Sequence, residues 1–417
     1  RAVVARQLLS RRGGAVATTA ALLLAAATLL WWLRYPAASV AASVQPISAP
    51  AGAGARLPRL AAHPAGGAVL SWVEPAPDGG HVLRAARYRD GRFETPVEVA
   101  RGRDWFVNWG DFPSVVPIAA DFWLAHWLVR HPRADSPYHY GIAMAGSSDD
   151  GRRWTTRPAP HADVGPAEHG FAAIAALDDR AAMVWLDGRA NDARHSFALR
   201  TTEIERDGAA AAESIIDSDV CSCCWPALAR TRNQLWVAYR GRTNDEIRDF
   251  QLRYRTVAGW SAPIALAGEG WRIAGCPTNG VSLAAQDERL AAAWYTAADG
   301  VARVRVAFIR DGGNALESIH DVDVATPVGR AAIAWLDSER VAALHIAASS
   351  SALADLRLTL LSDRGIERSL TLIQVPANRD SGVPQLLAVD GELLVAWTDA
   401  APGHGVRVLR VPQRALR

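Results

Sequence analysis

A repeated unit of 51 to 58 residues constrains the fold of this 417-residue chain more than any other feature. Seven apolar segments each carry a large aromatic residue or a histidine near their end, at successive spacings of 55, 58, 54, 55, 51 and 52 residues. The marker residues are Trp72, Trp127, Trp185, Tyr239, Trp294, His345 and Trp397. A period near 50 residues with several strands in each unit is typical of a β-propeller rather than of separate domains.

Each unit is interpreted as four strands. In the fourth unit, apolar alternation and β-branched residues predict strands at 225–230, 235–240, 247–255 and 263–267, separated by turns rich in Gly, Asp and Asn. The seventh unit ends after its third strand, and residues 44–47, just ahead of the first unit, are expected to supply its outer strand. That exchange would leave no open sheet edge. We therefore predict an all-β propeller of four-stranded blades at 56–417, with seven blades by repeat count and six as the alternative.

The amino-terminal segment is basic and then apolar. Residues 15–33 are uncharged and mostly apolar, and 19 residues are enough to cross a hydrocarbon core of roughly 30 Å. The arginines before them predict a cytoplasmic amino end. The prediction is a cytoplasmic basic end and transmembrane anchor at 1–34 and a linker at 35–55, with a cleaved signal peptide as the alternative. Both interpretations place the propeller in the periplasm or outside the cell, and the anchor places it on the inner membrane.

The charge distribution argues against a nucleic-acid partner. Five of the 45 basic residues lie in the first 34 residues, which contain no acidic residue, so 40 remain against 43 acidic residues. A nucleic-acid-binding domain would instead show a basic surface.

Chemically active side chains are predicted to share one face of the ring. The first and second strands of a blade are antiparallel neighbours, so the start of one and the end of the other lie at the same edge. The starts include Arg56, Asp111, His169, Cys221–Cys224 and Cys276–Asn279, and the ends include Asp187, Arg189, Arg240, Arg242 and Asp399. Propellers commonly bind ligands at such a loop-rich face, where arginine forks suit a carboxylate or a phosphate.

Two alternatives apply to this face. The charged residues of 240–249, including Arg242, Glu246 and Arg248, could instead pair with one another in a solvated loop. The aromatic residues of 105–109 could stack on a sugar ring or pack over the rim. The scattered histidines His126, His131, His161 and His169 are interpreted as surface or packing residues rather than as ligands of a metal.

Three motifs resemble the sialidase superfamily. Residues 147–154, SSDDGRRW, match the Asp-box (BNR-repeat) pattern Ser-x-Asp-x-Gly-x-x-Trp, and Asp311-Gly312-Gly313 resembles a second copy. Arg56-Leu57-Pro58 is similar to the Arg-Ile-Pro signature of the first sialidase blade. The stretch 221–249 with Cys276-Pro277 resembles a bacterial exo-alpha-sialidase-like group. The resemblance covers roughly 56–412 and implies that Asp149 holds a turn between the third and fourth strands of its blade.

The resemblance implies a glycoside hydrolase that releases terminal sialic acid or related acidic sugars from glycans, without a cofactor or a metal. The residues expected to bind the anionic ligand are Arg56, Arg240, Arg242, Arg248 and Asn279. Asp111 is expected to act as the acid, and Tyr295 with Glu246 as the covalent pair. The tyrosine of this family comes from a late blade, whereas units six and seven here contain none. A non-catalytic propeller that binds a ligand or a protein is therefore the alternative.

The chain has four cysteines, Cys221, Cys223, Cys224 and Cys276. Cysteines outside the cytoplasm are usually oxidised, so two disulfides are expected, one of them joining Cys276 to one of the other three cysteines across units four and five. One alternative is a cysteine-dependent metal-binding protein, because clustered thiolates suit copper or zinc. The other is a set of redox-active or free thiols.

Overall fold

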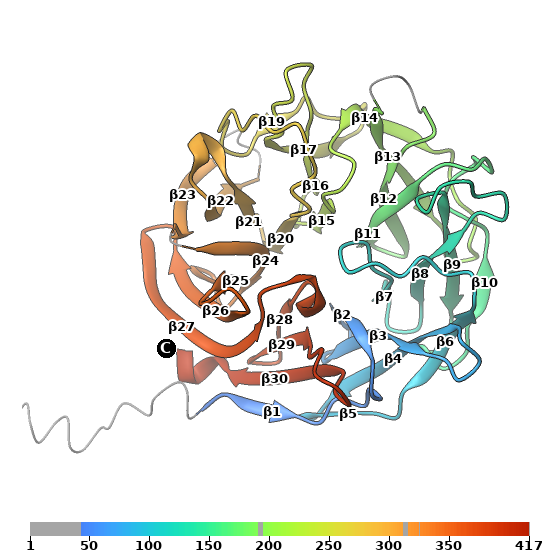
Figure 1. Cartoon of the computed structure of the whole chain (residues 1–417), viewed down its shortest axis with the longest axis horizontal. Helices are drawn as coiled ribbons and strands as arrows, with labels where there is room; N and C mark the ends of the chain where they lie inside the picture. The colour runs from blue at the N-terminus through green and yellow to red at the C-terminus, as the bar shows by residue number, and fades with distance from the viewer. Residues whose placement is uncertain (1–42, 191–194, 312–315, 325, 417) are drawn as a thin grey trace, which may run out of the picture. The chain divides into compact units, whose positions relative to one another are not determined.

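The computed structural model describes residues 43–190, 195–311, 316–324 and 326–416. Val44–Arg417 forms one compact unit, in which the described residues build seven antiparallel sheets arranged as the blades of a ring (Figure 1). The predicted anchor at 1–34 lies outside the described residues. Within the described part of the chain, no helix is both long enough and apolar enough to cross a membrane.

The blades follow one another in chain order. Blade 1 contains β2 (Arg56–Ala62), β3 (Ala68–Pro75), β4 (His81–Arg89), β5 (Arg92–Phe93) and β6 (Val97–Gly102). Blade 2 contains β7 (Ser114–Pro117), β8 (Trp123–Arg130), β9 (Tyr140–Ser147) and β10 (Thr155–Arg157). Blade 3 contains β11 (His169–Leu177), β12 (Arg180–Asp187), β13 (Phe197–Ile204) and β14 (Ser214–Val220). Blade 4 contains β15 (Ala227–Arg230), β16 (Leu235–Arg240), β17 (Phe250–Thr256), β18 (Gly259–Trp260) and β19 (Ile264–Ala265).

The last three blades complete the ring. Blade 5 contains β20 (Val281–Gln286), β21 (Arg289–Thr296), β22 (Arg303–Arg310) and β23 (Leu316–Asp323). Blade 6 contains β24 (Pro327–Trp335), β25 (Arg340–Ala348), β26 (Leu353–Ser362) and β27 (Gly365–Pro376). Blade 7 contains β28 (Gln385–Val389), β29 (Glu392–Thr398), β30 (Val406–Pro412) and β1 (Gln45–Ile47). Short 3-10 helices are η1 (Ala298–Gly300), η2 (Arg379–Ser381) and η3 (Gln413–Leu416).

The amino-terminal strand closes the ring. β1 pairs antiparallel with β30, with Pro46 opposite Leu409, so the outer strand of blade 7 comes from the start of the described chain (Figure 1). The predictions of seven blades and of a closing strand at 44–47 are confirmed, and the six-blade alternative is wrong. The exchange covers the edge of β30, which would otherwise expose unpaired backbone groups.

The second strands are the most deeply buried because each blade packs against a neighbour on both faces. All six residues of β16 are buried, and Trp72, Trp185 and Trp294 are at most 1% exposed. Continuous apolar runs of this kind are what a strand covered on both sides requires. The inner strands of the blades line a central cavity of about 640 Å³.

The Ser147–Trp154 segment forms a tight turn between β9 and β10. Asp149 Oδ1 accepts hydrogen bonds from Ser147 Oγ and from the Arg153 backbone N–H, each at 2.9 Å. Gly151 has a φ of +77°, and a Cβ there would lie 2.5 Å from the Trp123 ring. Asp149 therefore stabilises the turn at the blade edge opposite the start of β9. The expected second copy lies partly outside the described residues, and its Asp311 accepts from Trp236 Nε1 at 2.8 Å.

Candidate functional site

The predicted convergence of distant segments on one face is confirmed for blades 4 and 5. The backbone N–H of Cys221 donates to the carbonyl of Arg240 at 2.9 Å. The Sγ atoms of Cys221 and Cys224 are 3.7 Å apart, and Cys276 Sγ lies 3.8 Å from Ser222 Oγ. The start of one inner strand, the end of a second strand and the start of the next inner strand therefore meet at one edge.

A pair of carboxyl groups shares one tyrosine hydroxyl at this edge. The Tyr140 hydroxyl lies 2.8 Å from Asp111 Oδ2 and 2.9 Å from Glu168 Oε1. The Phe171 backbone N–H donates to the other oxygen of Asp111 at 2.8 Å. A phenol has one proton to donate, so it can serve only one carboxylate. The second contact is a hydrogen bond only when the other carboxyl group is itself protonated.

Burial makes a bound proton favourable here. Burial raises the pKa of Asp111 to about 7, although the hydrogen bonds from Tyr140 and Phe171 lower it. Burial likewise raises the pKa of Glu168 to about 8, with the Tyr140 hydrogen bond lowering it and the charges of Asp111 and Cys276 adding to the rise. The two groups share a hydroxyl, so they titrate as a pair. Asp111 and Tyr140 are each 1% exposed, whereas Glu168 is half-buried and is the member nearest solvent.

Chain geometry explains how this cluster forms. Asp111 precedes β7, Glu168 precedes β11, and Tyr140 begins β9, where a backbone bridge pairs it with Glu168. Gly170 allows the close approach, because a Cβ there would lie 2.2 Å from Asp111 Oδ2. Asp111 was predicted from the sequence, whereas Tyr140 and Glu168 were not. The third strand of each blade starts at the edge at which the second strand ends. Applying the same strand-direction argument to the third strands would therefore have predicted Tyr140 at this edge.

In the loop between β16 and β17, two arginines pair with the same glutamate, Glu246. Glu246 lies 2.6 Å from Arg242 Nη2 and 2.7 Å from Arg248 Nη2. The Arg242 hydrogen bond, the largest cause, lowers the pKa of Glu246 to about 2, and Arg248 adds to this against partial burial. Mutual pairing of these residues, the predicted alternative, is what the structure shows. A carboxylate with so low a pKa is a poor base.

The predicted covalent pair is not brought together. Tyr295 packs edge-on against Trp271, with ring centroids 5.9 Å apart. Within the described residues, the hydrogen bonds of the Glu246 side chain go to Arg242 and Arg248, and none joins it to Tyr295.

Two other predicted ligand-binding residues connect blades instead. Arg240 is 1% exposed and donates to the carbonyls of Arg248 at 2.7 Å and Tyr295 at 2.9 Å. Asn279 is 7% exposed, and its Oδ1 accepts from the Arg330 backbone N–H at 2.7 Å. These contacts join blade 4 to blade 5 and blade 5 to blade 6, and such burial disfavours direct contact with a ligand.

Arg56 lies instead on a separate cavity of about 540 Å³. The lining is made by the start of β2, the loop before β7, η2 and the end of β29 with the loop after it. Its polar and aromatic members are Arg56, Asn108, Trp109, Arg379, Asp380, Thr398, Asp399 and His404. Arg56 is exposed, and the Arg379 guanidinium lies 5.6 Å from the Trp109 ring centroid. Arg56 and Trp109 were predicted at this face from the sequence. Arg379 and Asp380 were not, because they belong to an irregular segment without a repeat signal.

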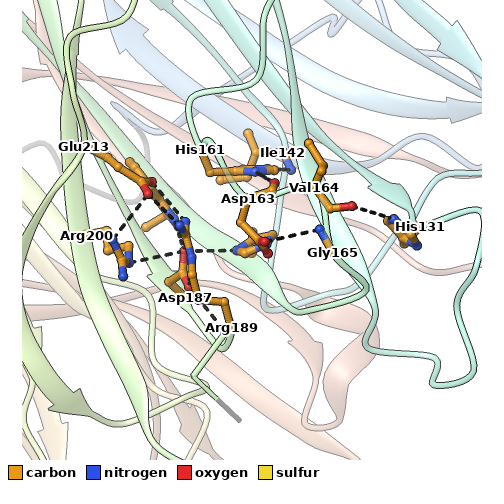
Figure 2. Close-up of polar contacts among 12 residues, drawn as sticks. His131, Ile142, His161, Asp163, Val164, Gly165, Asp187, Arg189, Arg200 and Glu213 are labelled. Carbon is orange, nitrogen blue, oxygen red and sulfur yellow. Dashed lines mark hydrogen bonds and ion pairs between the residues drawn. The ribbon is translucent and has the colours of Figure 1, made fainter.

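A third polar network holds the edge of blade 3 (Figure 2). His169 Nδ1 lies 3.1 Å from Asp187 Oδ2, and its Nε2 lies 2.9 Å from Asp163. Arg189 lies 2.7 Å from the same Asp187 oxygen. Burial raises the pKa of Asp187, but hydrogen bonds from His169 and Arg189 hold it well below its usual range. The network fixes the loop that ends at Glu168.

The other histidines also make structural contacts. The His161 ring stacks on that of His169 at 4.2 Å, and His131 Nε2 lies 3.1 Å from the Val164 carbonyl (Figure 2). His126 is fully buried, with Nδ1 3.0 Å from Ser114 Oγ. These placements agree with their interpretation as packing residues.

All four cysteines are free thiols in the structure. Cys221 and Cys224 are buried, Cys223 is half-buried and Cys276 is exposed. Hydrogen bonds from Cys223 and Cys224 hold the pKa of the Cys221 thiol well below its usual range. The side chain of Cys276 interacts with that of Cys223, so the predicted meeting of these cysteines across blades 4 and 5 is observed, although without a bond between them.

Comparison with known proteins identifies the fold alone. No protein-family model matches the sequence, and no curated protein matches it. An ulvan lyase from a polysaccharide lyase family is similar in structure, with a TM-score of 0.52 and 13% identity over 88% of this chain and 96% of that chain. A Hadza microbial sialidase has a TM-score of 0.48 and 13% identity, covering 80% of this chain and 74% of that one. A Penicillium chrysogenum alpha-L-arabinanase complexed with arabinobiose has a TM-score of 0.48 and 13% identity, covering 89% and 98%.

Proposed function

We propose that this propeller is a carbohydrate-active enzyme that cleaves glycosidic bonds, with Glu168 as the proton donor. The observation that carries the proposal is the single Tyr140 hydroxyl placed between Asp111 and Glu168, at 2.8 and 2.9 Å. A general acid works best when its pKa lies near the working pH, and a carboxyl group reaches that range only when its surroundings disfavour the charged form. Glu168, with its pKa raised to about 8, meets this requirement.

The three residues have different roles in this proposal. Glu168, the half-buried member, protonates the oxygen of the leaving sugar as the glycosidic bond breaks, while a water molecule forms the new bond to the sugar carbon and releases its proton to solvent. The Tyr140 hydroxyl then donates to the new Glu168 carboxylate and stabilises its charge. Asp111 is a positioning residue, because it is buried and touches the substrate side only through Tyr140.

An acidic sugar is the proposed substrate class. Arg56 is exposed on the 540 Å³ cavity, where its guanidinium can pair with a carboxylate. An ulvan lyase with a similar fold is described as bound to a saccharide of GlcA and Rha3S. The finer proposal is release of terminal sialic acid, supported by the likeness of Arg56-Leu57-Pro58 and Ser147–Trp154 to sialidase motifs.

We further propose that the propeller acts outside the cytoplasm, held to the inner membrane by residues 15–33. Their length and lack of charge support this placement. Protease treatment of spheroplasts should digest the propeller, whereas protection of the propeller would reject this location.

Activity assays test the enzymatic proposal. The protein should release the fluorophore from a fluorogenic sialoside, or the reducing ends of uronate-containing oligosaccharides, near neutral pH. Glu168→Gln should lower kcat at least about 100-fold, because general acid catalysis contributes on this scale. Glu98→Gln, on an exposed ion pair with Arg101 in blade 1, serves as the matched control and should keep full activity. Absence of turnover on both substrate classes would reject the proposal.

A non-catalytic glycan-binding propeller is the second candidate. The observation that favours it is the burial of Asp111 and Tyr140, which leaves Glu168 without an exposed nucleophile among its hydrogen-bond partners in the described residues. This candidate predicts that Arg56→Ala abolishes glycan binding while Glu168→Gln leaves the affinity unchanged. Calorimetric titration with sialyllactose distinguishes the two cases.

A further inference from the structure

We propose that Cys221, Cys223 and Cys224 bind one thiophilic metal ion, Zn²⁺ or Cu⁺, through three thiolates, with Cys276 placed to become a fourth ligand. The Sγ atoms of the first three residues all lie within 4.8 Å of one another. No cysteine lines the Arg56 cavity, whereas Cys276 also acts on the carboxyl pair, because its charge raises the pKa of Glu168.

The sulfur spacing matches a metal site. Cys221 Sγ lies 3.8 Å from Cys223 Sγ and 3.7 Å from Cys224 Sγ. Metal–sulfur bonds of about 2.3 Å in a tetrahedron put the sulfur atoms about 3.8 Å apart. The observed separations therefore already have the length of the edges of such a polyhedron, and one ion at its centre could reach all three sulfurs.

The local fold holds these thiols in place. The Cys-x-Cys-Cys turn directs its three sulfurs toward one point, and the Cys221 backbone N–H is bonded to the Arg240 carbonyl at 2.9 Å. Cys221 and Cys224 are at most 1% exposed. A buried donor set held by backbone contacts requires little reorganisation to accept an ion.

A positively charged side chain contacts one of the three sulfurs. Arg248 Nη1 lies 3.5 Å from Cys221 Sγ, and the same guanidinium pairs with Glu246. Three thiolates exceed the charge of either ion, so a cation that hydrogen-bonds a ligand sulfur offsets the excess. Outer partners of this kind orient metal ligands and tune their basicity.

The need for a fourth ligand distinguishes Zn²⁺ from Cu⁺ at this site. Cys276 is exposed, interacts with the Cys223 side chain and lies 3.8 Å from Ser222 Oγ. Soft thiolates select Cu⁺ and Zn²⁺ among biological metals, and structural Zn²⁺ sites are almost always four-coordinate. A Zn²⁺ site would recruit Cys276 and connect blade 5 to blade 4, whereas Cu⁺ would be satisfied by the three clustered thiolates.

Metal titration of the reduced protein tests the site. Zn²⁺ or Cu⁺ alone is added anaerobically to the intact protein in competition with a chromogenic chelator. We expect one equivalent of metal per chain and, with Co²⁺ as a probe, thiolate-to-metal charge-transfer absorption. Cys223→Ser should weaken binding of either ion at least about 100-fold, because it removes one of three charged ligands. Ser222→Ala, in the same turn, is the matched control and should bind within about twofold of the wild type.

Cys276→Ser identifies the ion. Loss of Zn²⁺ affinity with Cu⁺ affinity retained supports four-coordinate Zn²⁺ and three-coordinate Cu⁺ binding at the same cluster. Thermal unfolding of each metal-free variant shows whether it folds, and the exposed position of Cys276 keeps that variant informative if Cys223→Ser unfolds. Substoichiometric metal on the fully reduced protein, or unchanged affinity in folded Cys223→Ser, would overturn the proposal. The proposal would also be overturned if the protein is isolated with two disulfides and binds no metal once these disulfides are reduced.

Discussion

Glu168→Gln should remove much of the pH dependence of this protein's stability between pH 5 and pH 9. Burial raises the pKa of Glu168 from 4.5 to about 8 and that of Asp111 from 3.8 to about 7. The folded state therefore binds these protons more tightly than the unfolded chain does. The resulting stabilisation is fully present below about pH 4 and is lost as the pH rises through 7 to 8.

The magnitude follows from the shift. One pKa unit corresponds to about 1.36 kcal/mol, so the rise for Glu168 amounts to on the order of 4 kcal/mol. The contribution of Asp111 does not simply add to this, because both groups contact one hydroxyl and titrate as a pair. We expect the free energy of unfolding of the wild type to fall by about 4 kcal/mol from pH 5 to pH 9.

Urea denaturation at one-unit pH intervals measures this slope. The glutamine variant should lose half of the slope or more, since its amide does not titrate. Glu246→Gln is a control of opposite sign, because the pKa of Glu246 is lowered to about 2. The stability from Glu246 is present above pH 4.5 and is lost as the pH falls toward 2, so this variant should differ from the wild type at neutral pH and converge with it in acid. A wild-type stability that is flat or rises from pH 5 to pH 9 would refute the reasoning.

Three further perturbations test the fold around the site. Arg240→Met should lower the free energy of unfolding by about 3 kcal/mol in urea titrations, because buried carbonyls lose a charged donor. Deletion of residues 43–47 removes β1 and should lower the calorimetric midpoint by about 5 °C or more and promote association through the exposed β30 edge, whereas an unchanged midpoint would contradict closure by β1. Gly170→Ala should lower the free energy of unfolding by about 2 kcal/mol or more, because the added Cβ would lie 2.2 Å from Asp111 Oδ2. Gly275→Ala is the control and should be nearly neutral, because no atom lies within 4 Å of the added carbon. Equal melting temperatures of the two variants would contradict the close packing at Gly170.

Most of the architecture was predictable because a propeller repeats one simple unit. Every blade must cover its second strand on both faces, so each second strand repeats a buried apolar run with a large marker residue. For β16 the predicted and observed bounds coincide, and the closing strand was predicted because the seventh unit lacked an outer strand.

The candidate site was only partly predictable. Strand direction places Asp111, Cys221 and Cys276 at one edge, but it does not say which side chains contact each other. Arg240 was expected to face a ligand, and the structure buries it against the carbonyls of neighbouring blades. Tyr140 and Glu168 had no motif to mark them.

The linear chain predicted strand order and the edge at which each segment emerges, and it favoured seven blades over six, because these features depend on a burial pattern that repeats along the sequence. Only the tertiary structure decided which acid shares a proton, which arginine is enclosed and which sulfurs gather around one point. Those outcomes depend on ångström-scale approaches between loops of different blades, and a loop has no repeat from which its path can be inferred.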